Sequence, residues 1–457
     1  MSLVLFPSPP AAHASIEGIA PEPALLPRAP QTIDETGLSM PFLVELVAKT
    51  MYQLGLTHLT ELSQQLCLGV PVTDAVCQFM RRESLIELTR RGQHDADVQY
   101  DLVQSGRGRA ADWLARNSYV GPAPVPLEAY AERVRAQSVT HHKVTASTMA
   151  AAFADLVVPP RLLDLLGSGV NSGRAILLHG AAGSGKTYLA EHLQRLLGGA
   201  VAIPHAIIVH GEVIRVYDAE HHHALPATGN AARSALDSRA RPDARWLSCG
   251  RPVIVSGGEL TLEMLDLSFD ARAGYYEAPP HFKANNGLFV VDDLGRQMIS
   301  PTQLMNRWIV PMERRYDHLM LRNGGKFTIP FDLVLVFSSN LSPAQLEDAA
   351  FLRRIGHKIA VGALSAAEYR IVFERECERA GLGFDAAVFE SMLRDYHAGQ
   401  GQPLYAAVPR DLVDLMRGRS VYLDQPAALT PELLDWAWNA YFSRDETVPG
   451  PPAGGLT

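Results

Sequence analysis

The sequence predicts an α/β protein with buried strands, and three apolar stretches support this prediction. Residues 175–178 form an apolar run that leads into a glycine-rich turn and then an amphipathic helical pattern. Residues 288–291 are four apolar residues followed by two aspartates, and residues 331–341 contain a third apolar run that ends in Asn340. Short apolar runs bounded by turn signals are typical of buried strands. We therefore expect a buried strand at each of these three places, with polar residues directly after it.

The turn after the first strand, GAAGSGKT at 180–187, fits the phosphate-binding pattern G-x-x-x-x-G-K-[ST] between a strand and a helix. Glycines let backbone N–H groups surround phosphates, and the helix N-terminus adds partial positive charge. We expect Lys186 to bridge the β- and γ-phosphates of ATP and Thr187 to bind Mg²⁺. The predicted nucleotide-binding residues are Gly180, Gly183, Ser184, Gly185, Lys186, Thr187 and Tyr188.

The second and third strands end in residues suited to phosphoanhydride hydrolysis. Asp292 is expected to complete the Mg²⁺ shell with Thr187. Asp293 stands where a water-polarising glutamate is usual, so its carboxylate is one methylene short and hydrolysis is expected to be slow. Asn340 is placed to orient the attacking water or to contact the γ-phosphate.

Three arginines are candidates for stabilising charge on the phosphates. Arg353 and Arg354 end a predicted helix just before an apolar strand, where a guanidinium can reach the nucleotide of a neighbouring subunit. Such an arrangement requires a head-to-tail interface, which closes cyclically. Arg410 begins a helix and could contact the same phosphates from within the subunit. The alternative for all three is an ordinary solvated or ion-paired surface arginine.

These residues together resemble the AAA+ ATPases: Walker A at 180–187, Walker B at 288–293, sensor-1 Asn340, the finger candidates Arg353 and Arg354, and sensor-2 Arg410 in PRDL. The resemblance covers residues 151–445. It implies a P-loop AAA+ αβα sandwich of strand order 5-1-4-3-2 with a C-terminal helical lid, ATP and Mg²⁺ as cofactors, and a homo-oligomer, usually a hexamer.

Residues 259–293 are similar to the helix-2-insert branch, such as the MoxR-type ATPases. In such rings the insert faces the central channel, and Phe269, Tyr275 and Tyr276 are the candidates for gripping a client. The alternative is that they pack the insert against its own domain. The GAFTGA loop of bacterial enhancer-binding activators is absent from the sequence, which reads LSFDARAGYY instead.

The region before the P-loop predicts a small α+β, winged-helix-like domain. Apolar periodicity indicates three helices, the first ending at Gly55 and the second capped by Thr57 or Thr60. Two short strands and a closing helix follow. Residues 40–118 hold nine acidic against eight basic residues, a balance unlike that of a phosphate-gripping module. Protein docking is therefore favoured over DNA binding, and both alternatives stay open.

The predicted organisation has six parts, bounded by composition and by the motifs. They are a disordered N-terminal segment (1–39), the winged-helix-like domain (40–118), a Pro-rich linker and connecting helix (119–150), the AAA+ domain (151–362), the helical lid (363–445) and a disordered tail (446–457). A run of three histidines, His221, His222 and His223, is expected to be a locally hydrogen-bonded loop rather than a metal site.

Composition limits the function classes. The chain of 457 residues has 41 basic and 49 acidic residues, and its net charge of −8 argues against a surface built mainly for nucleic acid. No apolar window is long enough for a membrane span, and four scattered cysteines fit a reduced, cytoplasmic protein. The leading hypothesis is an ATPase ring that remodels or assembles a protein client. The alternatives are a DNA-associated motor or regulator, and a scaffold that binds ATP but hardly hydrolyses it.

Overall fold

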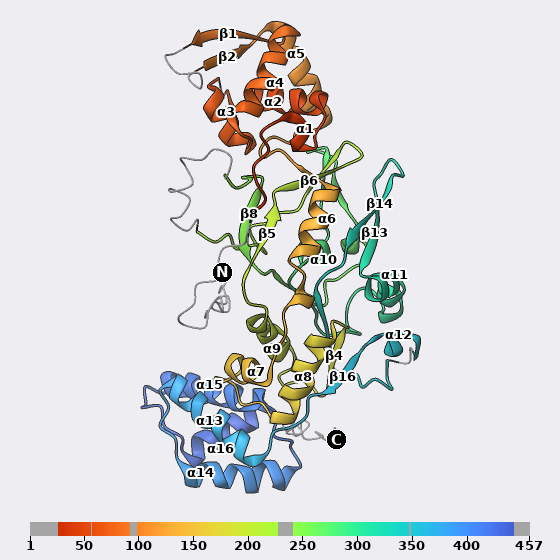
Figure 1. Cartoon of the computed structure of the whole chain (residues 1–457). Helices are drawn as coiled ribbons and strands as arrows, with labels where there is room; N and C mark the ends of the chain where they lie inside the picture. Colours follow the sequence, from red (N-terminus) through yellow and green to blue (C-terminus); the bar gives the residue numbers. More distant parts are fainter. Residues whose placement is uncertain (1–25, 56, 92–97, 227–240, 347–348, 443–457) are drawn as a thin grey trace, which may run out of the picture.

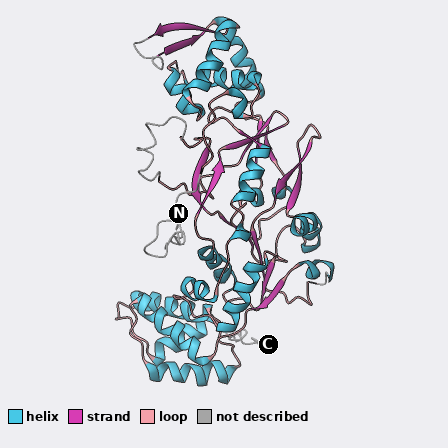
Figure 2. Ribbon diagram, viewed as in Figure 1, coloured by secondary structure: helices cyan, strands magenta, loops and turns pink. Residues whose placement is uncertain are grey.

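The computed structural model describes residues 26–55, 57–91, 98–226, 241–346 and 349–442. Figure 1 shows an elongated molecule, with an N-terminal domain at one end, a β-rich region in the middle and a helical domain at the other end. Helices dominate both ends, and strands gather between them (Figure 2). No helix in the described part of the chain is long and apolar enough to cross a membrane.

A five-stranded parallel sheet of order β16-β4-β15-β12-β9 forms the core of the molecule. Numbered along the chain, its strands have the order 5-1-4-3-2, so the predicted fold class is confirmed. The strands are β4 (Ile176–His179), β9 (Val253–Ser256), β12 (Leu288–Val291), β15 (Val334–Ser339) and β16 (His357–Ala360).

Apolar side chains cover both faces of the core sheet, which explains why its strands are apolar throughout. Phe289 and Phe337 pack on one face against Trp308 of α11 (Pro301–Arg314). Val290 and Val336 pack on the other face. The helices on that second face are α7 (Ala146–Ala152), α8 (Pro160–Ser172) and α9 (Lys186–His192), which η2 (Leu193–Leu196) extends.

A second, mixed sheet interrupts the core and has the order β10-β11-β7-β6-β3. Two antiparallel pairs, β5-β8 and β13-β14, lie in the same part of the chain. Residues 314–325 contain the end of the helix α11, the strand β13 and the turn that leads to β14. The elements are β5 (Ala200–Pro204), β6 (Ala206–Val209), β7 (Glu212–Arg215), β8 (Trp246–Gly250), η6 (Glu263–Leu265), β10 (Ser268–Asp270), β11 (Tyr275–Glu277), α10 (Pro280–Lys283), β13 (Tyr316–Met320) and β14 (Lys326–Pro330).

The segment expected to be a Pro-rich linker, 119–150, belongs to this β region. Its strand β3 (Val125–Pro126) pairs in parallel with β6, and Val125 is fully buried. In α6 (Leu127–Ala136), Tyr130 is buried, and its hydroxyl accepts a hydrogen bond from Asn285 Nδ2 at 2.9 Å. The prolines therefore shape an edge strand and a helix start rather than a free connector. The short turn η1 (Val139–His141) follows.

The aromatic residues of the insert, Phe269, Tyr275 and Tyr276, do not form an exposed surface that could hold a client. Tyr276 is buried, and its hydroxyl accepts a hydrogen bond from the Arg322 backbone N–H at 3.0 Å. Phe269 packs edge-on against Tyr276 and lies beneath the Arg322 guanidinium. Tyr275 packs against Tyr119 and the N-terminal domain. The alternative expectation, that these rings pack the insert against its own domain, describes Phe269 and Tyr276, whereas Tyr275 packs against the N-terminal domain.

The N-terminal domain consists of helices, a two-stranded antiparallel sheet and a closing helix. Ser39 caps α2, Gly55 ends it in the left-handed conformation, and α3 begins after His58, so neither Thr57 nor Thr60 is its cap. Disorder was expected for 1–39, yet Thr36 and Leu38 are buried; residues 1–25 lie outside the described part. The elements are α1 (Ile33–Thr36), α2 (Met40–Leu54), α3 (Leu59–Leu66), α4 (Val70–Arg82), β1 (Ile86–Arg91), β2 (Val98–Leu102) and α5 (Gln104–Arg116).

A helical domain follows the core sheet, and we call it the lid. Its aromatic core includes Tyr369, Phe373, Phe389 and Trp438. The predicted tail, 446–457, lies outside the described residues. The helices are α12 (Ala349–Arg354), which precedes β16, and then α13 (Ala366–Ala380), α14 (Ala386–Ser391), the π-helix η7 (Met392–Ala398), α15 (Ala407–Tyr422) and α16 (Pro431–Tyr441).

Candidate nucleotide-binding site

The glycine-rich turn joins β4 to α9, and its conformation requires its glycines. Gly180, Gly183 and Gly185 all have positive φ angles, of 153°, 78° and 94°. A Cβ atom on Gly180 would lie 2.2 Å from the Val361 carbonyl oxygen. Gly185 is also the N-cap of α9, so the positive end of that helix faces the turn. The turn therefore has the open backbone and the polarity that an anion requires.

Lys186 lies inside this turn and is almost fully buried. Its Nζ donates to the carbonyl oxygens of Gly180 at 3.0 Å and Ala181 at 2.9 Å, and to Asn340 Oδ1 at 2.9 Å. Burial lowers the pKa of the Lys186 ammonium, while the neighbouring Asp293 and Asp292 act in the opposite direction. The cation is thus held at the edge of the core sheet by three oxygen acceptors.

The acidic pair after β12 meets the P-loop directly. Thr187 Oγ1 donates to Asp292, at 2.8 Å to Oδ1 and 3.0 Å to Oδ2. Asp293 Oδ1 accepts from Asn340 Nδ2 at 2.8 Å, so Asp293, Asn340 and Lys186 form one hydrogen-bonded chain. The structure therefore brings together Lys186, Thr187, Asp292, Asp293 and Asn340, which the sequence placed on three separate strands.

The turn that carries Asp293 is held in an uncommon backbone conformation. Asp293 has a φ of 52°, in the left-handed region that non-glycine residues seldom adopt. Hydrogen bonds to the end of β15 hold this turn: Leu294 N–H donates to the Ser338 oxygen at 2.7 Å, and Ser339 Oγ donates to the Leu294 oxygen at 2.8 Å. Backbone strain of this kind is frequent at functional sites.

Two features of the site had no signal in the sequence. The Gln297 amide donates to the Asp292 carbonyl oxygen and accepts from Gly295 N–H, which braces the turn after β12. The start of α15 touches the P-loop, because Ala407 N–H donates to the Gly183 oxygen at 3.0 Å. The lid is therefore in direct contact with the phosphate-binding turn.

The remaining predicted residues lie at the margins of this cluster. Tyr188 is 54% exposed and packs on His192, with ring centroids 4.1 Å apart. Arg410 lies one turn into α15 and forms an exposed ion pair with Asp411 at 3.3 Å. Tyr188 follows the P-loop directly in the sequence. Arg410 lies on α15, whose start contacts the P-loop. The structure records no contact between either one and Lys186 among the described residues.

Arg353 and Arg354 lie at the C-terminal end of α12, which Figure 1 shows well apart from α9. Arg353 is exposed, and Arg354 Nε donates to Glu313 Oε1 of α11 at 2.7 Å. The pair therefore lies away from the P-loop of its own chain. Its guanidinium groups do not complete the cluster around Lys186.

The donor set fits ATP with Mg²⁺. The buried Ser184 hydroxyl has no hydrogen-bond partner among the described residues, so the turn holds a donor for one more acceptor. Thr187 and Asp292 offer the hydroxyl and carboxylate oxygens that Mg²⁺ prefers. The described residues contain no group of three or more His, Cys, Asp or Glu able to hold a metal alone.

Comparisons with known proteins cover parts of the chain. A family model described as a domain of unknown function, DUF8689, matches residues 365–440 in the lid. NtrX from Brucella abortus is a similar solved structure, with 13% identity, a TM-score of 0.37, and coverage of 59% of this chain and 51% of that one. The chain thus spans about half the length of NtrX.

The RuvB Holliday junction branch migration motor of Thermotoga maritima is 10% identical, with a TM-score of 0.35 and coverage of 62% of this chain and 69% of that one. A search of curated protein sequences gives no match. The chain itself has a parallel sheet of order 5-1-4-3-2, a P-loop after the first strand and a helical domain after the fifth.

Proposed function

We propose that this chain is a Mg²⁺-dependent AAA+ ATPase that forms a ring and uses hydrolysis to remodel or assemble a protein partner. One observation carries the proposal: Lys186 and Thr187 of the P-loop make direct hydrogen bonds to the polar residues that end β12 and β15. These residues bring a cation, a hydroxyl, two carboxylates and an amide together at one edge of the sheet. Such groups suit the binding and cleavage of a triphosphate.

Each residue has a separate task in this proposal. Lys186 leaves its carbonyl and Asn340 acceptors and donates to the β- and γ-phosphates. Thr187 and Asp292 would hold Mg²⁺, which when bound would supply positive charge to the phosphates. Asn340 orients a water that attacks the γ-phosphorus, and Asp293, released from the Asn340 amide, accepts the proton of that water. The bond between the γ-phosphorus and the β–γ bridging oxygen breaks, and ADP leaves with that oxygen. Asp293 is shorter than the usual glutamate, so we expect turnover to be slow.

The outward position of Arg353 and Arg354 supports a role between subunits. Since α12 lies apart from α9, these arginines would act on the nucleotide of the next subunit, while Arg410 at the start of α15 would act within its own. A guanidinium supplied from a neighbour requires a closed head-to-tail ring. We expect a hexamer, and removal of both Arg353 and Arg354 should reduce hydrolysis while leaving ATP binding intact.

The insert connects the nucleotide site to the N-terminal domain. The tip of the β10-β11 hairpin contacts the N-terminal domain, because Ser118 N–H donates to the Ala273 oxygen at 2.7 Å. The same segment continues through α10 into β12, which carries Asp292 and Asp293. A change at the nucleotide can therefore reach the N-terminal domain. We propose that this winged-helix-like domain, residues 40–118, selects the protein partner, in a ring of the helix-2-insert type.

Phosphate release from Mg-ATP tests the proposal. Lys186→Ala should reduce the rate by at least about 100-fold, the scale of losing one essential charge-stabilising donor. Lys143→Ala, which removes an exposed lysine, is the matched control and should not change it. Asp293→Asn should still bind ATP and should capture a partner that Lys186→Ala does not. A purified chain with no hydrolysis above background would leave only the nucleotide-gated scaffold.

Binding of duplex DNA by the N-terminal domain is the second candidate. Arg81 and Arg82 are exposed at the end of α4, and Arg90 is exposed on the adjacent β1. If these arginines bind phosphates, the affinity of the full chain for a duplex should fall steeply with salt, and Arg81→Glu with Arg82→Glu should weaken it. A flat salt dependence would favour protein docking.

A further inference from the structure

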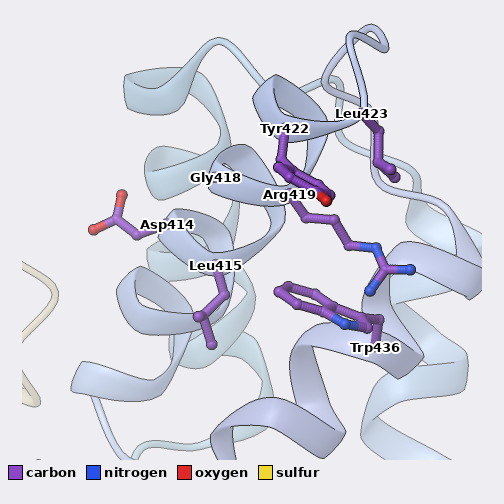
Figure 3. Close-up of a pocket in the computed structure, with 7 residues that line it drawn as sticks. All are labelled: Asp414, Leu415, Gly418, Arg419, Tyr422, Leu423 and Trp436. Carbon is purple, nitrogen blue, oxygen red and sulfur yellow. The ribbon is translucent and has the colours of Figure 1, made fainter.

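The lid carries a groove between the C-terminal end of α15 and the middle of α16 (Figure 3). Its cavity has a volume of about 440 Å³ and lies at the opposite end of α15 from the Ala407 contact with the P-loop. The groove is lined by Asp414, Leu415, Gly418, Arg419, Tyr422, Leu423 and Trp436. The Asp414 carboxylate forms an ion pair with Arg379 at 3.1 Å. It is thus separate from the nucleotide site and has no part in the proposed hydrolysis.

The rim of this groove exposes an unusual amount of apolar surface. Tyr422 is 86% exposed and Val421 is 77% exposed, the most exposed apolar side chains of α15. The neighbouring Leu423 is also exposed. Contiguous exposed apolar residues with a concave centre mark binding surfaces more often than scattered ones do. The groove and its rim therefore have the character of a binding surface.

Aromatic rings and one cation define that chemistry. Figure 3 shows the Arg419 side chain extending between the rings of Tyr422 and Trp436, and its guanidinium carbon lies 4.3 Å from the Trp436 ring centroid. Within the described residues Arg419 forms no ion pair, and the Trp436 indole N–H donates no hydrogen bond. The groove thus offers two flat rings, a positive charge and an N–H donor to a ligand. Proline-rich peptides in the polyproline II conformation bind aromatic grooves of this kind.

We propose that this groove binds the chain's own residues 443–457, SRDETVPGPPAGGLT. The prolines Pro449, Pro451 and Pro452 favour polyproline II and would pack on Tyr422 and Trp436. Asp445 and Glu446 precede them and supply the carboxylates that Arg419 lacks. The prolines of this segment therefore suit the aromatic rings of the groove, and its carboxylates suit the Arg419 charge.

The distances along the chain allow this contact within one molecule. Trp436 lies in α16, which ends at Tyr441, so only about 8 Å of helix separates it from the helix end. An extended chain covers up to about 3.3 Å per residue, and the first proline comes six residues after 443. The segment can thus turn back along α16 and place its prolines on the groove without strain.

A labelled peptide of residues 443–457 tests this proposal, with binding measured by fluorescence anisotropy. It should bind the chain truncated after residue 442 saturably. It should bind the intact chain at least about tenfold more weakly, because the native segment already occupies the groove. Tyr422→Ala in the truncated chain should weaken binding by about tenfold, as expected for an aromatic anchor. Tyr52→Ala, which removes an exposed tyrosine of α2, is the matched control and should have no effect.

Further variants separate the two features of the groove. A peptide with Pro449, Pro451 and Pro452 replaced by alanine should not bind. Arg419→Gln should weaken binding up to about fivefold and remove part of its salt dependence, the range of a surface ion pair. Tyr422 is so exposed that its replacement leaves the fold intact, which unchanged ATP binding would verify.

Four results would overturn the proposal. The truncated chain would fail to bind the peptide, or Tyr422→Ala and Tyr52→Ala would bind it equally. Equal binding by the intact and truncated chains would show a groove open to a proline-rich partner protein instead. Dimerisation of the truncated chain that depends on Tyr422, seen by sedimentation, would assign the groove to a second copy. None of these measurements depends on ATP hydrolysis.

Discussion

The core sheet and the inserted mixed sheet are built on different principles, although they are neighbours in the chain. In the core sheet, β12 and β15 are apolar on both faces, and the residues that end them form the candidate site. In the mixed sheet, β3 pairs with β6 and β11 pairs with β7 across long sequence intervals, and its edge contacts the N-terminal domain. The core sheet thus positions the residues of the candidate site, while the mixed sheet contacts the N-terminal domain.

The two sheets should therefore respond differently to substitutions. The core site depends on hydrogen bonds between the ends of strands that burial already holds in register. The mixed sheet has an apolar core of its own, and a few buried polar contacts also tie its region to distant segments. Substitutions that break those contacts should therefore loosen the N-terminal half of the molecule and leave the nucleotide site formed.

The largest expected effect comes from the buried ion pair of Arg245 and Asp243. Arg245 Nη2 lies 2.8 Å from Asp243 Oδ2, both side chains are almost fully buried, and Arg245 Nη1 also donates to the Thr36 carbonyl oxygen at 2.9 Å. Arg245→Leu leaves the Asp243 carboxylate buried without its partner, which typically costs about 3–5 kcal/mol. We expect a lower urea midpoint and early proteolysis between the N-terminal domain and β3.

Two companion variants make the Arg245 test specific. Arg109→Leu removes an exposed arginine of α5 and should cost little. Asp243→Leu combined with Arg245→Leu removes both charges and should recover part of the loss. If Arg245→Leu also abolished ATP binding, the two sheets would form one cooperative unit and the comparison would fail.

The core sheet was largely predictable because its signals are local. The run at 288–291 followed by Asp292, and the glycines around Lys186, each specify an element and its chemistry within ten residues. The mixed sheet was not predictable, since nothing local indicates that Val125 pairs with Ile207 or that Tyr276 pairs with Ile214. The contact of Ala407 with Gly183 was missed for the same reason. The roles of Arg353, Arg354 and Arg410 stay predictions, because a neighbouring subunit or a bound nucleotide would be needed to reveal them.

An intermediate effect is expected from acid, through His222 in the inserted region. Its imidazole is buried, its Nδ1 accepts from the Asp218 N–H at 3.0 Å, and its Nε2 donates to the Lys283 carbonyl oxygen at 2.8 Å. Burial is the main cause that lowers the His222 pKa to about 4. The folded state therefore resists protonation, so stability present above pH 6.5 is lost as the pH falls towards 4.

Between pH 7 and pH 5 this histidine should account for about 2 kcal/mol of lost stability. His222→Gln, which cannot be protonated, should reduce the difference between the urea midpoints at the two pH values. His318→Gln removes an exposed imidazole on β13 and is the control. An unchanged acid response in His222→Gln would show that other groups cause it, and that the inserted region is not the acid-sensitive part.

The smallest effect should come from a pair of glycines at two hairpin tips. Gly274, between β10 and β11, and Gly324, between β13 and β14, have φ angles of 74° and 84°, so alanine strains the backbone at both by roughly 1 kcal/mol. A Cβ on Gly274 would lie 2.2 Å from the Arg116 carbonyl oxygen, whereas a Cβ on Gly324 would meet no atom within 4 Å. Gly274→Ala should therefore cost about 1–2 kcal/mol more than Gly324→Ala, through overpacking against the N-terminal domain.

Urea midpoints of the two variants measure this difference in stability. Equal midpoints would mean that the hairpin does not pack closely on that domain in solution, which would contradict the proposed route from β12 to the N-terminal domain.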